Sequence, residues 1–575
     1  MFRHHRSGAA GGRTKIRPHA TGVPALFALV ALTGVLAAGC ATVDDADKPA
    51  GPLPATGWVA ADRDDVVDGG TLRLAIDSMP TTYQLHSVEA MEAGDLADLY
   101  LPSFVSLTAD GTWAANRDYA TDVSLVSTDP QVVQVQINPD AQWSDGTALT
   151  VTDVAANWQA LSGADEDYLV GSTAVWQDVE SVTAGADERD VLITFAEPNA
   201  DWPAVLGCIY PAWALDTPEH FNKAWRDGPL TADGTAYVSG GPFVVTNIDA
   251  QGQTIVLGRN DAWWGNTPKL DSVVFTAVTR TSQAQAFANR EIDVVNLNSD
   301  ADTYRTAKAR ADATVLRSRG SASRQITLNA AAPALSDVRV RQAFAMSLDR
   351  DVLARAVVSG VDSPVMLLDS LLFSPGQPGY EDHMSALLDG GVDGARALLA
   401  DAGYDTSGDQ ATKDGKPLTV RLVISAGVPT SASVAQLIAQ QTARAGITVE
   451  IDTVPYEKYF DYVEMRDFDA TYMALVGEAF PVANREPLYY PADSPWNFTG
   501  ITDDDLGPMW LEANAELDPA ARTTLANHID EHLVAMVTVI PLFSEPDAWG
   551  VTSTLRNYGP AQFESVRWAD VGFAT

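Results

Sequence analysis

Short stretches in which apolar residues alternate with polar or small ones recur along the chain and predict β-strands. In the first, Leu72, Leu74 and Ile76 are separated by single polar or small residues, as in a strand with one buried face. We expect further strands at residues 132–137, 191–195, 253–257, 272–278, 418–424 and 447–453.

Segments with helical periodicity fill the intervals between these strands. They cover residues 153–161, 282–289, 338–358, 394–402, 433–445 and 519–536. Gly403 and Gly446 follow two of the helices directly, and glycine readily takes the left-handed conformation that ends a helix. Strands interleaved with helices predict an α/β fold. We find no internal repeat that would indicate a solenoid or a propeller.

The N-terminal segment differs from the rest of the chain. Residues 1–39 contain basic residues but no acidic one, and an apolar run over 23–38 ends in small residues before Cys40. A basic start, an apolar middle and small residues at the end are typical of a secretory signal. The run is shorter than the roughly 20 residues that cross a membrane, which disfavours a transmembrane anchor.

A cysteine directly after small residues resembles the end of a bacterial lipoprotein signal. This resemblance implies cleavage before Cys40, acylation of its thiol and a place on the extracytoplasmic face of the cell membrane. Cys208 would then have no partner for an internal disulfide. Residues 40–65 are rich in Ala, Asp, Pro and Gly without apolar periodicity, which indicates a flexible tether.

Size and charge narrow the class of the mature body. With 575 residues and 61.2 kDa the chain is too long for one ordinary core, so two or more lobes are expected. The formal net charge is −39 and is spread along the chain. Such a surface repels phosphate backbones, so we expect no nucleic-acid partner.

The most informative motif runs from Gln136 to Val154. We interpret it as a strand ending at Ile137, a tight turn at Asp145-Gly146, and a helix capped by Thr150 with Asp153 three residues later. The motif resembles family 5 of the extracellular solute-binding proteins, the dipeptide- and oligopeptide-binding class. Five further segments agree with that family in order and spacing: 239–243, 259–265, 291–294, 337–350 and 539–543.

The resemblance implies an α/β fold of the type II periplasmic-binding-protein kind, with two lobes and an extra subdomain in the first. We expect the signal peptide at 1–39, the tether at 40–65, lobe I at 66–320 with an inserted subdomain at about 100–235, lobe II at 321–535 and a return to lobe I at 536–575. It also implies a substrate-binding component of an ABC importer, which closes its lobes around a small ligand and contacts permease subunits. We expect a monomer that is not an enzyme and holds no cofactor or metal.

Positions that match the family's ligand contacts come from both lobes. They are Met79, Tyr83, His86, Asn329, Phe373, Glu478, Phe480, Trp496 and Phe498. Peptide-binding members carry an Asp just before an aromatic-Pro pair, where it holds the amino terminus of the peptide. Here Ala479 precedes Phe480-Pro481, and Glu478 lies one position away. This departure makes a neutral ligand such as a sugar an alternative.

Two further functions stay open. Residues 101–104, 129–133 and 143–146 resemble the actinobacterial LpqW-type branch, which implies an accessory lipoprotein that binds a glycolipid or sugar-containing ligand in envelope assembly. His528 and His532 fit a His-x-x-Glu-His zinc pattern, which would make the chain a metallopeptidase. However, both histidines lie beside the apolar stripe of their predicted helix, as residues on a solvated flank also do.

Overall fold

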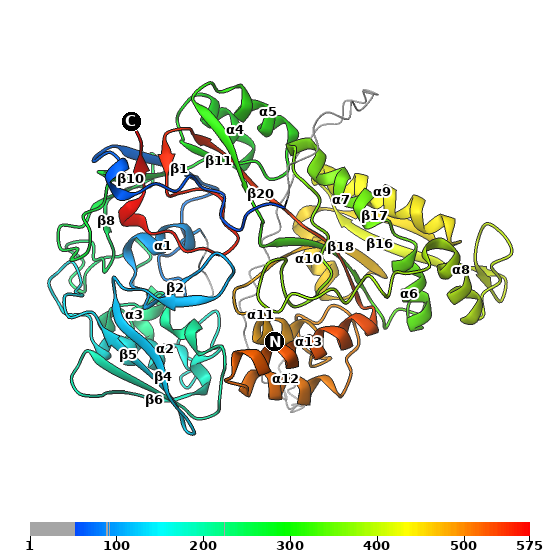
Figure 1. Cartoon of the computed structure of the whole chain (residues 1–575), viewed down its shortest axis with the longest axis horizontal. Helices are drawn as coiled ribbons and strands as arrows, with labels where there is room; N and C mark the ends of the chain where they lie inside the picture. The colour runs from blue at the N-terminus through cyan, green and yellow to red at the C-terminus, as the bar shows by residue number, and fades with distance from the viewer. Residues whose placement is uncertain (1–51, 88–89, 91, 224) are drawn as a thin grey trace, which may run out of the picture.

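Strand β1 (Thr71–Ile76) begins the first of two large lobes in the computed structural model, which describes residues 52–87, 90, 92–223 and 225–575. It pairs in parallel with β10 (Ser272–Ala277), and the sheet continues antiparallel through β9 (Thr254–Arg259) to β8 (Phe243–Asp249). This sheet lies at the left of Figure 1, beside the short helix α1 (Gly94–Tyr100). The smaller elements of the N-terminal half are β2 (Val105–Leu107), β3 (Trp113–Ala115), α3 (Pro218–Lys223), α4 (Arg280–Ala288) and α5 (Ala301–Ala309).

A second sheet is inserted between β1 and β8. Its strands are β4 (Ala120–Thr128), β5 (Gln131–Ile137), β6 (Val179–Ala184) and β7 (Asp190–Phe195), in the order β4-β5-β7-β6, with helix α2 (Val151–Leu161) beside them. The predicted capping box is confirmed, because the amide of Thr150 donates to Asp153 at 3.0 Å and the Thr150 hydroxyl accepts from the helix. Below, this unit is called the inserted sheet (lower left of Figure 1).

Lobe II is built on a five-stranded sheet in the order β17-β16-β18-β13-β19. Its strands are β13 (Ala322–Leu328), β16 (Thr419–Ser425), β17 (Thr448–Val454), β18 (Ala470–Val476) and β19 (Val539–Ser544). Its helices are α6 (Val338–Met346), α7 (Arg350–Val358), α8 (Gly391–Asp401), α9 (Pro429–Arg444), α10 (Tyr456–Glu464), α11 (Pro481–Arg485), α12 (Leu506–Ala515) and α13 (Pro519–Met536). A small hairpin joins β14 (Thr412–Lys413) and β15 (Lys416–Pro417).

Two stretches of chain connect the lobes. The first joins β12 (Ala313–Ser318) to β13, and the second joins β19 to β20 (Asp547–Thr552). Strand β20 pairs with β12 and with β11 (Val294–Asn296), so the two connections run side by side. The chain ends on lobe I with β21 (Leu555–Arg556) and β22 (Gly572–Phe573).

Three expectations need correction. The helix expected over 338–358 is two helices, because the carboxylate of Asp349 accepts from Val352 and starts a new helix after Ser347. The return to lobe I begins later than residue 536, because β19 pairs with β13 inside the lobe II sheet. The tether ends before residue 65: the amide of Gly57 donates to Pro560, and Arg63 pairs with Asp570 at 2.8 Å.

The glycine helix ends agree with the prediction, since Gly403 and Gly446 have φ of 89° and 91°. The signal peptide at 1–39 and Cys40 lie outside the described residues. Within the part of the chain that the structure describes, no helix is both long and apolar enough to span a bilayer.

Candidate ligand site

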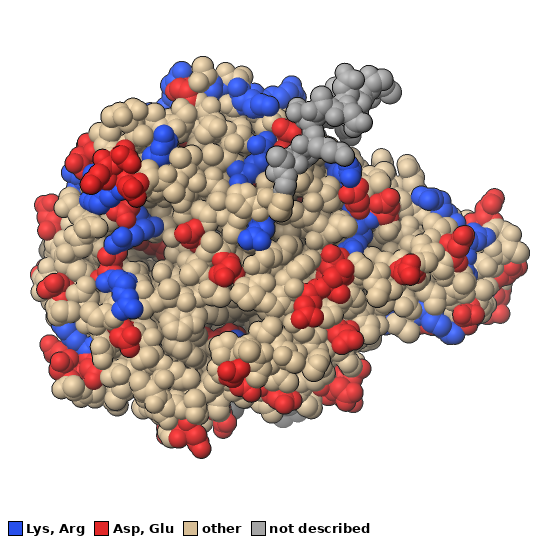
Figure 2. All heavy atoms as spheres, viewed as in Figure 1, with Lys and Arg blue, Asp and Glu red and all other residues tan. Residues whose placement is uncertain are grey.

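Helix α1 presents two carboxylates on one side of lobe I. Its Leu96, Leu99 and Tyr100 are buried, whereas Asp95 and Asp98 on the other side are exposed. Burial nevertheless raises the pKa of Asp98 to about 6, and the charge of Asp95 adds to the shift. A shift of this direction shows that protein atoms around Asp98 disfavour its charged form although the side chain is exposed. The face drawn in Figure 2 is hollowed between the two lobes.

The position of α1 follows from the Ser239-Gly240-Gly241 motif. The amide of Gly240 donates to the carbonyl of Tyr100 at 2.8 Å, and the Ser239 hydroxyl donates to Phe243 at 2.6 Å. A Cβ on Gly241 would lie 2.3 Å from the carbonyl oxygen of Leu99. Only glycine therefore permits this close approach, and the motif fixes the end of α1 against β8.

The returning C-terminal segment adds aromatic rings and a third carboxylate. Trp549 donates its indole N–H to Asp547 at 2.8 Å, and its ring centroid lies 5.7 Å from that of Tyr558. Burial raises the pKa of Asp547 to about 6. Burial and the charges of Asp95, Asp547 and Asp98 raise the pKa of Tyr558, so these side chains lie close together. We call Asp95, Asp98 and Asp547 the acidic lining.

A buried ion pair lies where the chain passes between the lobes. Arg324 on β13 and Glu545 after β19 are 3.0 Å apart, with side chains 5% and 8% exposed. The guanidinium carbon of Arg324 also lies 5.8 Å from the ring centroid of Tyr472. This pair ties the start of one connection to the end of the other.

The three predicted ligand residues of lobe I follow β1. The carbonyl of buried Tyr83 accepts the hydroxyl of Tyr210 at 2.9 Å. His86 Nε2 lies 3.2 Å from the carbonyl oxygen of Cys208, and burial lowers the pKa of His86 to about 4, so its ring is neutral at pH 7. Met79 is half-buried against the core of lobe I.

The predicted aromatic residues Trp496 and Phe498 lie together in lobe II. Their ring centroids are 6.5 Å apart, and they line a cavity of about 20 Å³ beside Thr327 of β13. That volume has room for one water molecule. Asn329 follows β13, and its side-chain Nδ2 donates to the carbonyls of Arg466 and Phe468, each at 3.1 Å. The amide of Asn329 is thus committed to holding this loop.

The other three predicted positions lie on neighbouring loops of lobe II. Phe373 is 7% exposed and packs in the lobe core. Phe480, half-buried, precedes α11. Glu478 accepts a hydrogen bond from Asn484; burial raises its pKa, and the charge of Arg485 opposes that shift. A carboxylate already engaged in this way is less available to a ligand amine.

The structure therefore brings the predicted residues into a lobe I group and two lobe II groups, and their contact with a ligand stays a prediction. Sequence reasoning missed the acidic lining. A signal for part of it was present, because Asp95 and Asp98 stand three residues apart among the apolar residues of α1, as on one helix face.

The two histidines of the zinc pattern do not converge with a third ligand. His528 is exposed, and His532 Nε2 lies 3.2 Å from Asp503. Over the described residues, no group of three His, Cys, Asp or Glu side chains could hold a metal ion. His528 and His532 therefore lie on the solvent-facing side of α13.

The family model described as bacterial extracellular solute-binding proteins, family 5 middle, matches residues 115–495. The chain is also 33% identical over 513 residues to the oligopeptide-binding protein OppA of Mycobacterium tuberculosis, covering 88% of this chain and 85% of that protein. The chain belongs to family 5 of the extracellular solute-binding proteins. The predicted family is thereby confirmed, and with it a solute-binding protein of the OppA-like kind.

A second relative matches a smaller part of the chain. The probable monoacyl phosphatidylinositol tetramannoside-binding protein LpqW of M. tuberculosis is 28% identical over 389 residues, which cover 62% of this chain and 59% of that protein. The likeness predicted from the early motifs is thus present, over a shorter span than the likeness to OppA.

Solved structures confirm the two-lobed fold. The periplasmic EDTA-binding protein EppA superposes with a TM-score of 0.79 and 24% identity, covering 92% of this chain and 100% of that chain. The oligopeptide-binding protein AppA of Bacillus subtilis, in complex with a nonapeptide, gives a TM-score of 0.68 and 18% identity, covering 89% and 100%. At this identity the likeness concerns the fold alone.

Proposed function

We propose that the chain is the lipid-anchored substrate-binding component of an ABC importer and that it binds an oligopeptide between its lobes. The observation that carries this proposal is the 33% identity to an oligopeptide-binding protein over 85% of that protein's length. A ligand that contacts both lobes stabilises the closed state by its differential affinity for that state. Binding in this account involves no catalysis and no cofactor.

The acidic lining supports a ligand with a positive charge. Asp95, Asp98 and Asp547 lie near the ring of Tyr558, and Asp547 accepts the indole N–H of Trp549. Carboxylates attract a protonated amino terminus, and aromatic faces pack against peptide side chains. The nine residues predicted from the sequence, with the acidic lining added, form the proposed site.

The anchor is proposed from the sequence of the N-terminal segment. Acylated Cys40 would hold the body on the extracytoplasmic face, and residues up to about 53 would span the gap to the docked Pro54, whose carbonyl accepts from Arg319 at 2.7 Å. Cys40→Ser should release the protein from the membrane fraction. Persistence of the variant in that fraction would refute lipidation at Cys40.

A second function is supported by the surroundings of Glu478. Because its carboxylate is engaged by Asn484, the position nearest the family's amine-binding Asp is occupied within the protein. That observation, together with 28% identity to LpqW, favours a sugar-containing ligand in envelope assembly as the alternative.

Thermal unfolding of the Cys40→Ser protein distinguishes the two functions. A ligand at 100 times its Kd adds about 2.7 kcal/mol to the free energy of unfolding, enough for a clear rise in Tm. We expect a pool of tri- to hexapeptides to raise the Tm and a mannoside series to leave it unchanged. A rise in Tm with mannosides and none with peptides would favour the sugar-containing ligand over the oligopeptide. If acetylating the amino termini of the peptides abolishes the rise in Tm, the free amine is the group that the protein recognises.

A further inference from the structure

An ion pair joins the inserted sheet to lobe II at one rim of the molecule. Arg522 Nη1 on α13 lies 2.5 Å from Asp201 Oδ1, which precedes the short helix Trp202–Leu206. The two side chains are 15% and 3% exposed. In Figure 1 the inserted sheet and helices α11–α13 lie next to each other below the centre of the view.

The loop that carries Asp201 is held rigidly on the lobe I side. Gln131 of β5 exchanges two hydrogen bonds with the backbone of Asn199, at 3.0 and 2.7 Å. The Asn199 side chain donates to Asp178 at 2.7 Å and accepts from the amide of Asp201 at 2.8 Å. These bonds hold the backbone of the loop from the lobe I side.

Lobe II supplies a matching surface of three elements. The amide of Ala483 on α11 donates to the second oxygen of Asp201 at 3.4 Å, and the carbonyl of Asn514 on α12 accepts from the amide of Ala200 at 2.8 Å. Arg522 Nε donates to the carbonyl of Ala513 at 3.1 Å, which aims the guanidinium across the rim. Each lobe thus holds its own charged side chain with contacts inside that lobe, and the two lobes meet through this pair and two backbone hydrogen bonds.

We propose that Asp201 and Arg522 form a latch that holds the lobes together at this rim and biases the protein toward the closed state before ligand arrives. The latch is distinct from the two connecting segments, which lie where β20 pairs with β11 and β12. Opening about these connections would separate Asp201 from Arg522 and return both charges to water.

Such a latch changes the equilibrium between the open and closed states. Breaking a buried pair by removing one partner leaves the other charge buried only while the lobes stay closed, so the penalty falls on the closed state. The open state, with both groups hydrated, is little changed. The closed fraction therefore decreases, and the apparent affinity for any ligand of the closed state decreases by the same factor.

Small-angle scattering of ligand-free protein tests the latch without knowledge of the ligand. A compact chain of this length has a radius of gyration of about 25 Å, and we expect Asp201→Asn to raise the measured value by about 1 Å. The matched control is Asp351→Asn, which breaks an ion pair of the same 2.5 Å length between exposed side chains within α7. That control should leave the radius unchanged.

The charge exchange Asp201→Arg with Arg522→Asp separates a latch from a folding defect. If the pair is a latch, the exchange restores most of the wild-type radius, and the far-UV circular dichroism of all variants is that of the wild type. An Asp201→Asn protein with the wild-type radius would overturn the proposal. So would an expanded variant that has lost secondary structure. Peptide binding by an Asp201→Asn protein that keeps the wild-type radius would leave the proposed function standing and overturn the latch.

Discussion

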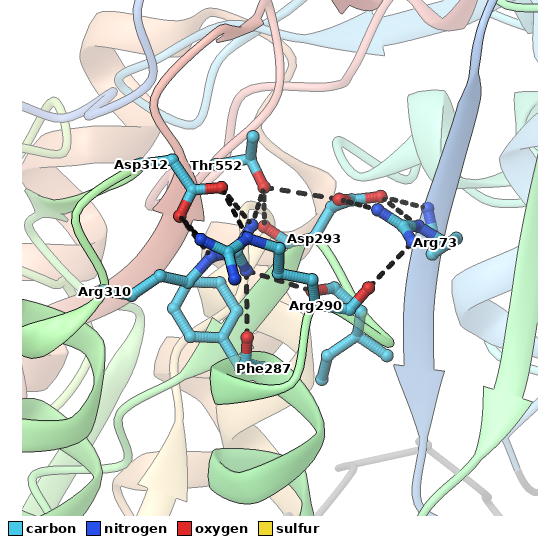
Figure 3. A network of polar contacts seen from close by, with 8 residues as sticks. Arg73, Phe287, Arg290, Asp293, Arg310, Asp312 and Thr552 are labelled. Carbon is cyan, nitrogen blue, oxygen red and sulfur yellow. Dashed lines mark hydrogen bonds and ion pairs between the residues drawn. The ribbon is translucent and has the colours of Figure 1, made fainter.

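Two groups of charged residues hold this molecule together in different ways. Within lobe I, Arg73 of β1 donates to both carboxylate oxygens of Asp293 at 3.0 and 2.8 Å, while Arg310 contacts Asp312 and the hydroxyl of Thr552 (Figure 3). At the rim, Asp201 and Arg522 form one pair between parts that belong to different lobes.

The difference lies in what each contact connects. The lobe I network joins β1, β20 and the segments that precede β11 and β12, so opening it requires these parts of lobe I to separate (Figure 3). The rim pair joins two bodies that are each complete without it. An Arg–Asp pair in the lobe I network should therefore affect the free energy of unfolding. The Arg–Asp pair at the rim should affect the fraction of molecules in the closed state.

The largest effect is expected from Arg73→Met. Asp293, whose side chain is 3% exposed, would lose its paired guanidinium and keep the Arg73 amide and the Thr552 hydroxyl as donors, which costs about 2–3 kcal/mol. Urea unfolding should show this loss in the free energy of unfolding. Arg305→Met, in which a 74% exposed side chain is replaced, is the control and should change it by less than about 0.5 kcal/mol. A cost below about 1 kcal/mol for Arg73→Met would contradict the structural role of the network.

Asp201→Asn should have a smaller effect and a different one. We expect the Kd for a bound peptide pool to rise about tenfold, equivalent to 1.4 kcal/mol, because the closed fraction decreases. Isothermal titration measures that change. Urea unfolding in the absence of ligand should shift far less than for Arg73→Met. A loss of folding stability as large as that of Arg73→Met would erase the distinction between the two regions.

The acidic lining predicts a weaker dependence on pH. Asp98 and Asp547 have pKa values of about 6, so they are charged near neutral pH and become protonated as the pH falls below 6. Affinity for a free-amine peptide should therefore fall several-fold between about pH 7.5 and pH 5. Fluorescence titrations at a series of pH values would show it. The double substitution Asp98→Asn with Asp547→Asn should flatten the profile, and a profile unchanged by it would exclude these carboxylates.

The raised pKa values of Asp98 and Asp547 affect folding stability in the opposite direction to peptide affinity: stability increases as the pH falls. A carboxyl group whose pKa is raised in the folded state binds its proton more tightly there than in the unfolded chain. Its destabilising contribution is therefore complete above about pH 6 and is relieved as the pH falls toward the ordinary value near 4. The doubly substituted protein should thus be slightly more stable than wild type near neutral pH and equal to it in acid, as thermal unfolding would measure.

The smallest effect is expected from His528→Ala. Because His528 is exposed and His532 pairs with Asp503, added zinc should not alter the Tm of the wild type or of the variant. A stabilisation by zinc that disappears in the variant would reopen the metallopeptidase alternative.

Local signals explain what the sequence could predict. Strand β1 and helix α2 were found because alternation, the turn at Asp145-Gly146 and the Thr150 cap all lie within a few residues of the elements they define. The break between α6 and α7 was missed because the apolar periodicity continues through it, and only the capping role of Asp349 separates the helices.

The features that the sequence could not predict depend on contacts between residues far apart in the chain. Asp201 and Arg522 are 321 positions apart, and nothing near either residue indicates the other. The acidic lining joins α1 to β20 through the return of the chain to lobe I, so Asp547 could be placed beside Asp98 only in the folded molecule. The spacing of Asp95 and Asp98 indicates one face of a helix, but it does not indicate which other residues that face meets.

Scattering during a peptide titration of the Asp201→Asn protein tests the hinged capture of a ligand most directly. The account predicts that the radius of gyration falls with peptide saturation until it reaches the wild-type value, because bound peptide closes lobes that the latch no longer holds. Saturable peptide binding with a radius that stays constant throughout the titration would contradict it.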